Sequence, residues 1–154
     1  MKALTLFDPW ATLCVLGEKQ FETRSWPTNH RGSLAIHVSK NSPPEAKALC
    51  STEPYRSVLA AHLGEFAWHP GCIIGTVEVV GMHPTIGHAG LVYINPTAKE
   101  RAFGDYSPGR WAWELKNPRR LPTPIPCRGR QGLWTVPSEL VTQMMFQGFE
   151  VASG

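Results

Sequence analysis

The sequence of 154 residues contains no apolar run close to the roughly 20 residues that a membrane-spanning helix requires. The N-terminal apolar stretch carries one lysine and is interrupted by Asp8 and Pro9, a pattern typical of a first strand and not of a signal peptide. We therefore expect no membrane partner. The chain also lacks internal repeats and a break in composition, so a single domain spanning residues 1–154 is expected.

Cysteine is scarce, and its four copies lie far apart in the sequence, at Cys14, Cys50, Cys72 and Cys127. There is no Cys-x-x-Cys pair and no Cys/His cluster with zinc spacing. The five-residue interval between His83 and His88 is weak evidence for a metal. We expect reduced, mostly buried thiols in a cytoplasmic protein, with no metal site and no cofactor.

Charge is also sparse, at 18% of residues and a net +3, but it is unevenly distributed. Residues 116–130 contain five basic residues and no acidic one, whereas the rest of the chain carries ten basic and twelve acidic residues. The five are Lys116, Arg119, Arg120, Arg128 and Arg130. This segment is predicted to be either a phosphate-facing edge or a solvated proline-rich loop.

Short strands and frequent Pro/Gly turns indicate an α+β fold with a small, strongly bent mixed sheet or barrel. Alternating or β-branched runs predict six strands, at 2–7, 21–26, 33–39, 72–82, 111–115 and 133–136. Helical patterns are expected at 9–16, in a broken region over 41–63, in one turn near 98–102, and at 137–147. The remainder of 83–105 is expected to be a long irregular loop.

Residues 17–37 concentrate the chemically useful side chains. With a period of two, Glu22, Arg24 and Trp26 share one face of a strand. On the following strand, which is expected to neighbour the first in the sheet, His37 lies on the face opposite the apolar residues, between small side chains. An acid, a guanidinium, an indole and an imidazole close to Lys19 suggest the wall of a pocket.

Several motifs in this region and beyond it resemble the ASCH domain family, a branch of the PUA-like superfamily. The resemblance spans nearly the whole chain, and its most specific part is Gly17-x-Lys19-x-x-Glu22-x-Arg24-x-Trp26. The other matching segments are Lys2-Ala3-Leu4-Thr5-Leu6, Pro9-Trp10-Ala11, Arg31-Gly32-x-Leu34-Ala35-Ile36-His37, Gly75-Thr76-Val77-Glu78-Val79, Gly109-Arg110-Trp111-Ala112-Trp113 and Pro124-Ile125-Pro126-x-x-Gly129.

The resemblance implies a PUA-like small mixed β-barrel with peripheral helices, a cleft at Lys19, Glu22 and Arg24, and an association with RNA or modified nucleosides. Some bacterial members of the family are amidohydrolases acting on an acylated cytidine, with a threonine three residues after the lysine. Glu22 occupies that position here, and a carboxylate cannot form the hydroxyl-derived acyl intermediate. Hydrolysis of the threonine-dependent type is therefore not expected.

Most candidate residues have both a functional and a structural interpretation. Lys19 is a phosphate anchor, a general base or an exposed turn residue, and Glu22 and Arg24 either contact a ligand or brace the barrel as an ion pair. Trp26 either stacks on a base or fills the core. His37 is either a proton-transfer group or a hydrogen-bonded structural histidine.

The favoured hypothesis is an RNA- or nucleotide-binding domain with a cationic cleft. The predicted ligand-binding residues are Lys19, Glu22, Arg24, Trp26, Arg31, His37 and Glu78. Glu78, in an apolar strand, is expected to pair with the cations of the cleft. The basic segment 116–130 is expected to track a nucleic-acid backbone beyond the pocket.

Two other functions remain open from the sequence. The first is a small hydrolase acting on an acylated nucleoside or on RNA in the same cleft, with water activated by Lys19, Glu22 or His37. The second is a protein-interaction module that uses the loop over 83–105.

Overall fold

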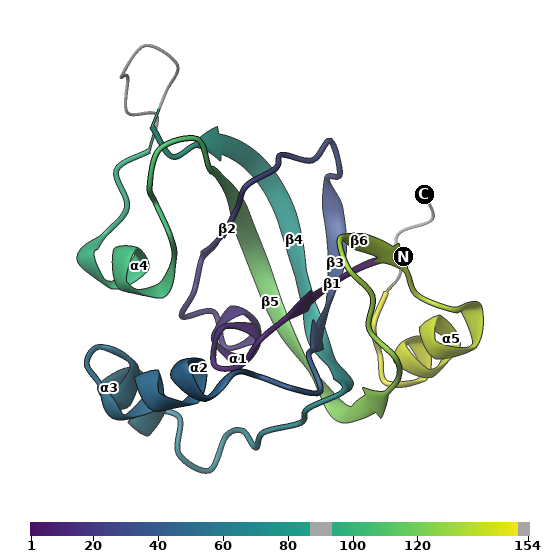
Figure 1. Cartoon of the computed structure of the whole chain (residues 1–154). Helices are drawn as coiled ribbons and strands as arrows, with labels where there is room; N and C mark the ends of the chain where they lie inside the picture. The colour runs from purple at the N-terminus through teal and green to yellow at the C-terminus, as the bar shows by residue number, and fades with distance from the viewer. Residues whose placement is uncertain (87–93, 151–154) are drawn as a thin grey trace.

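A single curled sheet of six strands forms the framework of the protein (Figure 1). The structure is a computed structural model, and it describes residues 1–86 and 94–150. The strands follow the order β2-β5-β4-β3-β1-β6, and neighbours are antiparallel except for the parallel pair β1 and β3. They are β1 (Lys2–Leu6), β2 (Phe21–Arg24), β3 (Gly32–Val38), β4 (Cys72–Pro84), β5 (Trp111–Pro126) and β6 (Leu133–Thr135).

Within the described residues, five short helices surround the sheet (Figure 1). They are α1 (Trp10–Val15), α2 (Pro44–Ala48), α3 (Tyr55–Ala60), α4 (Ala98–Phe103) and α5 (Ser138–Phe146), with a 3-10 turn η1 (Leu49–Ser51) between α2 and α3. Each predicted strand and helix is confirmed, including the helical turn in the segment 83–105. His88 lies outside the described residues. No helix in the described ranges is long and apolar enough to cross a membrane.

The two faces of the sheet bury different cores. Because side chains alternate along a strand, Leu34, Ile36 and Val38 of β3 pack on one face beneath α1, and Ala35 packs on the other. The second face is covered by α5 through Met144. Helix α1 also contributes its outer side to a third cluster with α3 and α4, so helices lie two deep on the first face.

Strand β5 continues well beyond its predicted end at residue 115. The prolines at 118, 122, 124 and 126 favour a loop in this region, because proline has no N–H to donate to the hydrogen bonds between strands. The structure accommodates them through register shifts between β4 and β5, after Ile73, Thr76 and Val79. These irregularities bend the sheet and produce the predicted small, strongly curved fold.

The curled sheet is an open half-barrel. Strands β2 and β6 are the two edges of the sheet. The curl of the sheet brings β2 close to β1, but these two strands do not pair. The guanidinium of Arg24 on β2 spans this seam, with Nη2 donating to the backbone carbonyl of Thr5 on β1 at 3.3 Å. The seam is where the sheet leaves room for a site.

Candidate functional site

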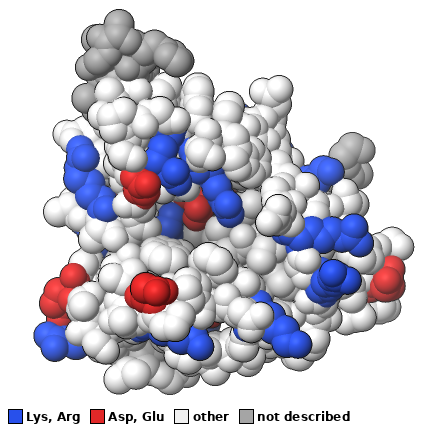
Figure 2. Space-filling model, in the orientation of Figure 1, with Lys and Arg blue, Asp and Glu red and all other residues white. Residues whose placement is uncertain are grey.

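A hollow of about 1460 Å³ opens at the seam between β1 and β2. Its lining combines β1, β2, the end of β3, the last residue of β5 and the loop that joins β5 to β6, together with residues from α1, α3 and α4. Basic side chains gather around it on the face drawn in Figure 2, with a few acidic groups among them. The basic residues lining it are Lys19, Arg24, Lys40, Arg110, Arg128 and Arg130, and the acidic ones are Glu22 and Asp105.

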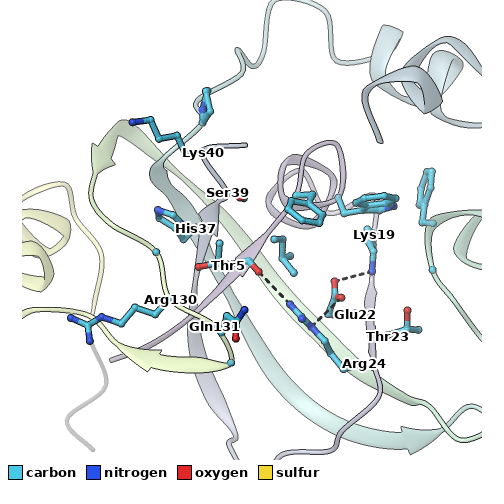
Figure 3. Close-up of a pocket in the computed structure, with 18 of the residues that line it drawn as sticks. Thr5, Lys19, Glu22, Thr23, Arg24, His37, Ser39, Lys40, Arg130 and Gln131 are labelled. Carbon is cyan, nitrogen blue, oxygen red and sulfur yellow. Dashed lines mark hydrogen bonds and ion pairs between the residues drawn. The ribbon is translucent and has the colours of Figure 1, made fainter. Parts of the chain in front are cut away.

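Three of the predicted residues form one ion-pair network on the floor of the hollow (Figure 3). Glu22 Oε2 lies 3.3 Å from Lys19 Nζ, and Glu22 Oε1 lies 3.5 Å from Arg24 Nε. The prediction that Glu22 and Arg24 share a face of the strand is confirmed. Burial is graded along the network: the side chain of Lys19 is 2% exposed, that of Glu22 12%, and that of Arg24 26%. Only Arg24 can readily meet a ligand.

Lys19 is a fixed ammonium in this network. Burial is the largest single influence and by itself would lower the pKa of Lys19, but the charge and hydrogen bond of Glu22, together with Cys14 and Glu100, outweigh it, so the pKa is raised. The ammonium also donates to the backbone carbonyl of Phe21. The neighbouring Cys14 thiol is neutral because burial raises its pKa to about 12. A protonated, buried lysine of this kind provides positive charge and cannot accept a proton.

The turn that presents Lys19 is held by groups from distant parts of the chain. Gly17, with φ at +80°, ends α1 and reverses the backbone so that the N–H of Lys19 donates to Leu13 O at 3.0 Å. Glu100 of α4 accepts from the N–H of Gln20 at 2.5 Å. On the outer side, Glu18 accepts from His62 at 2.9 Å and from Lys99 at 2.7 Å.

The His62 contacts predict a pH-dependent contribution to stability. Hydrogen bonds to Glu18 and Glu65 raise the pKa of His62, so its contribution is fully present below about pH 6.5 and is lost as the pH rises through the raised value. His62→Gln should lower the free energy of unfolding by about 1 kcal/mol or less at pH 5.5, since the pair is partly solvated, and by less at pH 9. Urea unfolding at both values measures this, and a difference independent of pH would contradict it.

Aromatic side chains form a second part of the wall. Trp26 lines the hollow and packs edge-on against Trp113, with ring centroids 4.8 Å apart, while Trp113 Nε1 donates to Trp26 O at 3.2 Å. Trp26 is half-buried, so it is both part of the core and available to a ligand. Trp10, Tyr55 and Phe103 line the side formed by the helices.

His37 also lines the hollow, but as a buried wall residue. It is 2% exposed, its Nε2 donates to Cys127 O at 3.0 Å, and its ring meets Trp134 edge-on. Burial lowers the pKa of His37, so the ring is neutral. Strand β3 is not the neighbour of β2, because β5 and β4 lie between them. The expectation of adjacent strands was wrong, and the curl of the sheet brings the two residues to one hollow.

Two predicted site residues lie elsewhere. Arg31 is exposed, and its Nη1 donates to Thr28 O and His30 O, so it closes its own turn. Glu78 accepts from Asn117 Nδ2 at 2.9 Å instead of pairing with the cleft cations. It lies opposite Lys116 of β5, on the face of β4 that does not carry Val77 and Val79, and β5 separates it from β2.

The five basic residues of 116–130 do not form one edge, contrary to the prediction. Arg128 and Arg130 lie at the mouth of the hollow. Arg119 and Arg120 line a smaller groove of about 760 Å³ beside α1, and Arg119 stacks on Phe149 at 4.5 Å. Lys116 lies 3.9 Å from Glu114. The extension of β5 carries its residues along the sheet, and only the loop beyond it returns to the site.

Sequence reasoning missed several residues of the hollow. Arg110 is fixed at its mouth by Asp105 at 3.5 Å and by the carbonyl of Thr23 at 3.1 Å. Lys40 and Tyr55 also line it. Each comes from an element that only the sheet order brings to the seam, so no local pattern indicated them. The described residues contain no group of three or more His, Cys, Asp or Glu that could hold a metal ion.

An open, curled mixed sheet with helices at its rim and a polar hollow at the seam defines a PUA-like domain. A family model described as the ASCH domain matches residues 4–124, and the chain belongs to that family. The predicted family and fold are confirmed.

One human protein, one mouse protein and two structures of a protein from Zymomonas mobilis are similar to this chain. The chain is 29% identical to Activating signal cointegrator 1 of Homo sapiens and 28% identical to that of Mus musculus, over 144 residues that cover 89% of this chain. It spans only 22% of the length of these relatives. The crystal structure of ASCH from Zymomonas mobilis is similar in fold, with a TM-score of 0.51 at 15% identity, covering 94% of this chain and 92% of that one. A point variant of the same protein gives a TM-score of 0.52 at 13% identity, covering 94% and 96%.

Proposed function

We propose that this domain binds RNA, or a nucleotide-like ligand, in the hollow at the β1–β2 seam. The carrying observation is the lining itself, in which six basic residues and two acidic ones surround a half-buried tryptophan. A polyanion with planar bases offers phosphates to the cations and a stacking partner to the indole. Membership of the ASCH family is consistent with this proposal.

Arg24 is the central residue of the proposed site. Glu22 and the carbonyl of Thr5 fix the orientation of its guanidinium, which remains partly exposed in the hollow. A guanidinium held in this way has donors left for a base edge or a phosphate. Trp26, two residues beyond the end of β2, lines the same hollow and offers a ring to a ligand held there.

The geometry favours binding over hydrolysis. Of the three candidate bases, Lys19 is an ammonium that cannot accept a proton. His37 uses Nε2 to hold a backbone carbonyl, and Gly129 lies against its other nitrogen. Glu22 is engaged by two cations. Turnover of RNA or acylated cytidine by the purified domain would reverse this preference.

The expected result with Arg24→Ala is a loss of RNA affinity of about 1–3 kcal/mol, or roughly 5- to 150-fold. Fluorescence anisotropy with a labelled single-stranded RNA measures it, and the affinity of the parent should fall steeply between about 50 and 200 mM salt. Arg56→Ala is the matched control, because Arg56 is exposed on α3 and paired with Glu53 at 3.0 Å, outside the hollow. The proposal fails if the parent binds neither RNA nor a nucleotide, or if Arg24→Ala binds as tightly as Arg56→Ala.

A further inference from the structure

The loop that joins β5 to β6 brings two arginines to the mouth of the hollow. Its residues 127–132 read Cys-Arg-Gly-Arg-Gln-Gly, and all six line the cavity. Within the described part of the chain, none of the backbone N–H groups of residues 128–132 donates a hydrogen bond. A short run of unpaired N–H groups that includes two residues with exposed guanidinium groups is chemically suited to an anion.

The first residue of this loop, Cys127, is held in place by two hydrogen bonds. The N–H of Cys127 donates to Gly71 O at 3.0 Å, and its carbonyl accepts from His37 Nε2 at 3.0 Å. Gly129 then lies so close to the wall that an added Cβ would stand 2.6 Å from His37 Nδ1 and 2.7 Å from Thr5 Oγ1. Only glycine permits this approach, which fixes the position from which Arg128 and Arg130 extend.

The basic side chains on the floor of the hollow are paired with a carboxylate, whereas those at its mouth are not. On the floor, Lys19 and Arg24 share the carboxylate of Glu22. At the mouth, Lys40, Arg128 and Arg130 are exposed and form no ion pair with any described residue. Figure 3 shows Lys40 and Arg130 on the side of the hollow where His37 lies, away from Lys19. The uncompensated positive charge is therefore displaced from the pocket floor.

We propose that the loop 127–132, with Lys40, is a phosphate-binding subsite for the sugar–phosphate chain that continues from a nucleoside held near Arg24 and Trp26. The ligand class is then an RNA chain and not a free nucleoside, because the uncompensated cations lie beyond the floor. This inference rests on the proposed function and specifies which chemistry the site requires. His37 and Gly129 are positioning residues in this arrangement.

The test compares two double variants that remove the same charge from the same region of sequence. Arg128→Ala/Arg130→Ala removes the subsite, and Lys116→Ala/Arg120→Ala removes two exposed cations that do not line the hollow. Each is titrated with single-stranded RNA, a nucleoside monophosphate, inorganic phosphate and the unphosphorylated nucleoside. We expect the first variant to lose about tenfold or more in RNA affinity, with a salt slope shallower by about 1.4, which corresponds to two lost phosphate contacts on a single strand. The control should keep the parent's affinity and slope.

Each outcome bears on a different claim. RNA binding that Arg24→Ala weakens but Arg128→Ala/Arg130→Ala leaves unchanged would overturn the subsite and leave the proposed function intact. An equal loss in the control would overturn it too, by showing only a general effect of charge. Tight binding of the free nucleoside or of inorganic phosphate, with none of RNA, would overturn the assignment of a chain ligand. A parent that binds none of the probes would overturn both proposals.

Discussion

Glu22→Ala should destabilise the protein by about 3–5 kcal/mol, because it leaves a buried charge without its partner. The side chain of Lys19 is 2% exposed, and Glu22 is the only carboxylate within 4 Å of its ammonium among the described residues. The ammonium would retain the carbonyl of Phe21, which cannot neutralise it. Urea unfolding at pH 7 measures the change.

The pH dependence of this variant provides a second measurement. Without Glu22, burial dominates and should lower the pKa of Lys19 below its unfolded value of about 10.4. The folded state then releases its proton first, so the variant should regain stability as the pH rises through that lowered pKa. The parent, in which the pKa of Lys19 is raised, has no such gain.

A double variant separates charge burial from simple loss of packing. Lys19→Met/Glu22→Ala removes the stranded charge together with its partner, so it should be more stable than Glu22→Ala alone. If the free energy of unfolding of Glu22→Ala lies within about 0.5 kcal/mol of that of the parent, the network is not a buried ion pair and the floor of the hollow is solvated.

The secondary structure and the core of the motif could be predicted because both are local. Apolar periodicity located all six strands, and a period of two placed Glu22 and Arg24 on one face. The sheet order could not be predicted from this information. Whether β3 or β5 pairs with β2 depends on long-range packing. Because β5 pairs with β2, His37 of β3 lies on the opposite side of the seam and lines the hollow from there.

The errors at Glu78 and in the basic segment have one physical origin. Four prolines concealed the extension of β5, because their missing N–H groups normally exclude a ladder. Once β5 is long, Lys116 pairs opposite Glu78, Arg119 and Arg120 follow the sheet, and only Arg128 and Arg130 return to the site. The bulges between β4 and β5 that permit this extension depend on where two backbones approach closely.

Gly75 marks that approach, and Gly75→Ala should cost about 3 kcal/mol or more, at or above the upper end of the range for overpacking. An added Cβ would lie 2.2 Å from the backbone carbonyl oxygen of Arg119 and 3.0 Å from Val15 Cγ1, and a paired strand cannot move aside without breaking the ladder.

Gly81→Ala, in the same strand, is the matched control. Its Cβ would come too close only to the side-chain ends of Glu114 and His83, at 2.8 and 3.0 Å, which can rotate away, and Glu114 Cβ lies at an ordinary contact distance of 3.5 Å, so a cost below about 1 kcal/mol is expected. Thermal and urea unfolding of both variants measures the contrast. Equal stability of the two would mean that β4 and β5 do not pair in this register, and the path that returns Arg128 and Arg130 to the hollow would then have to be redrawn.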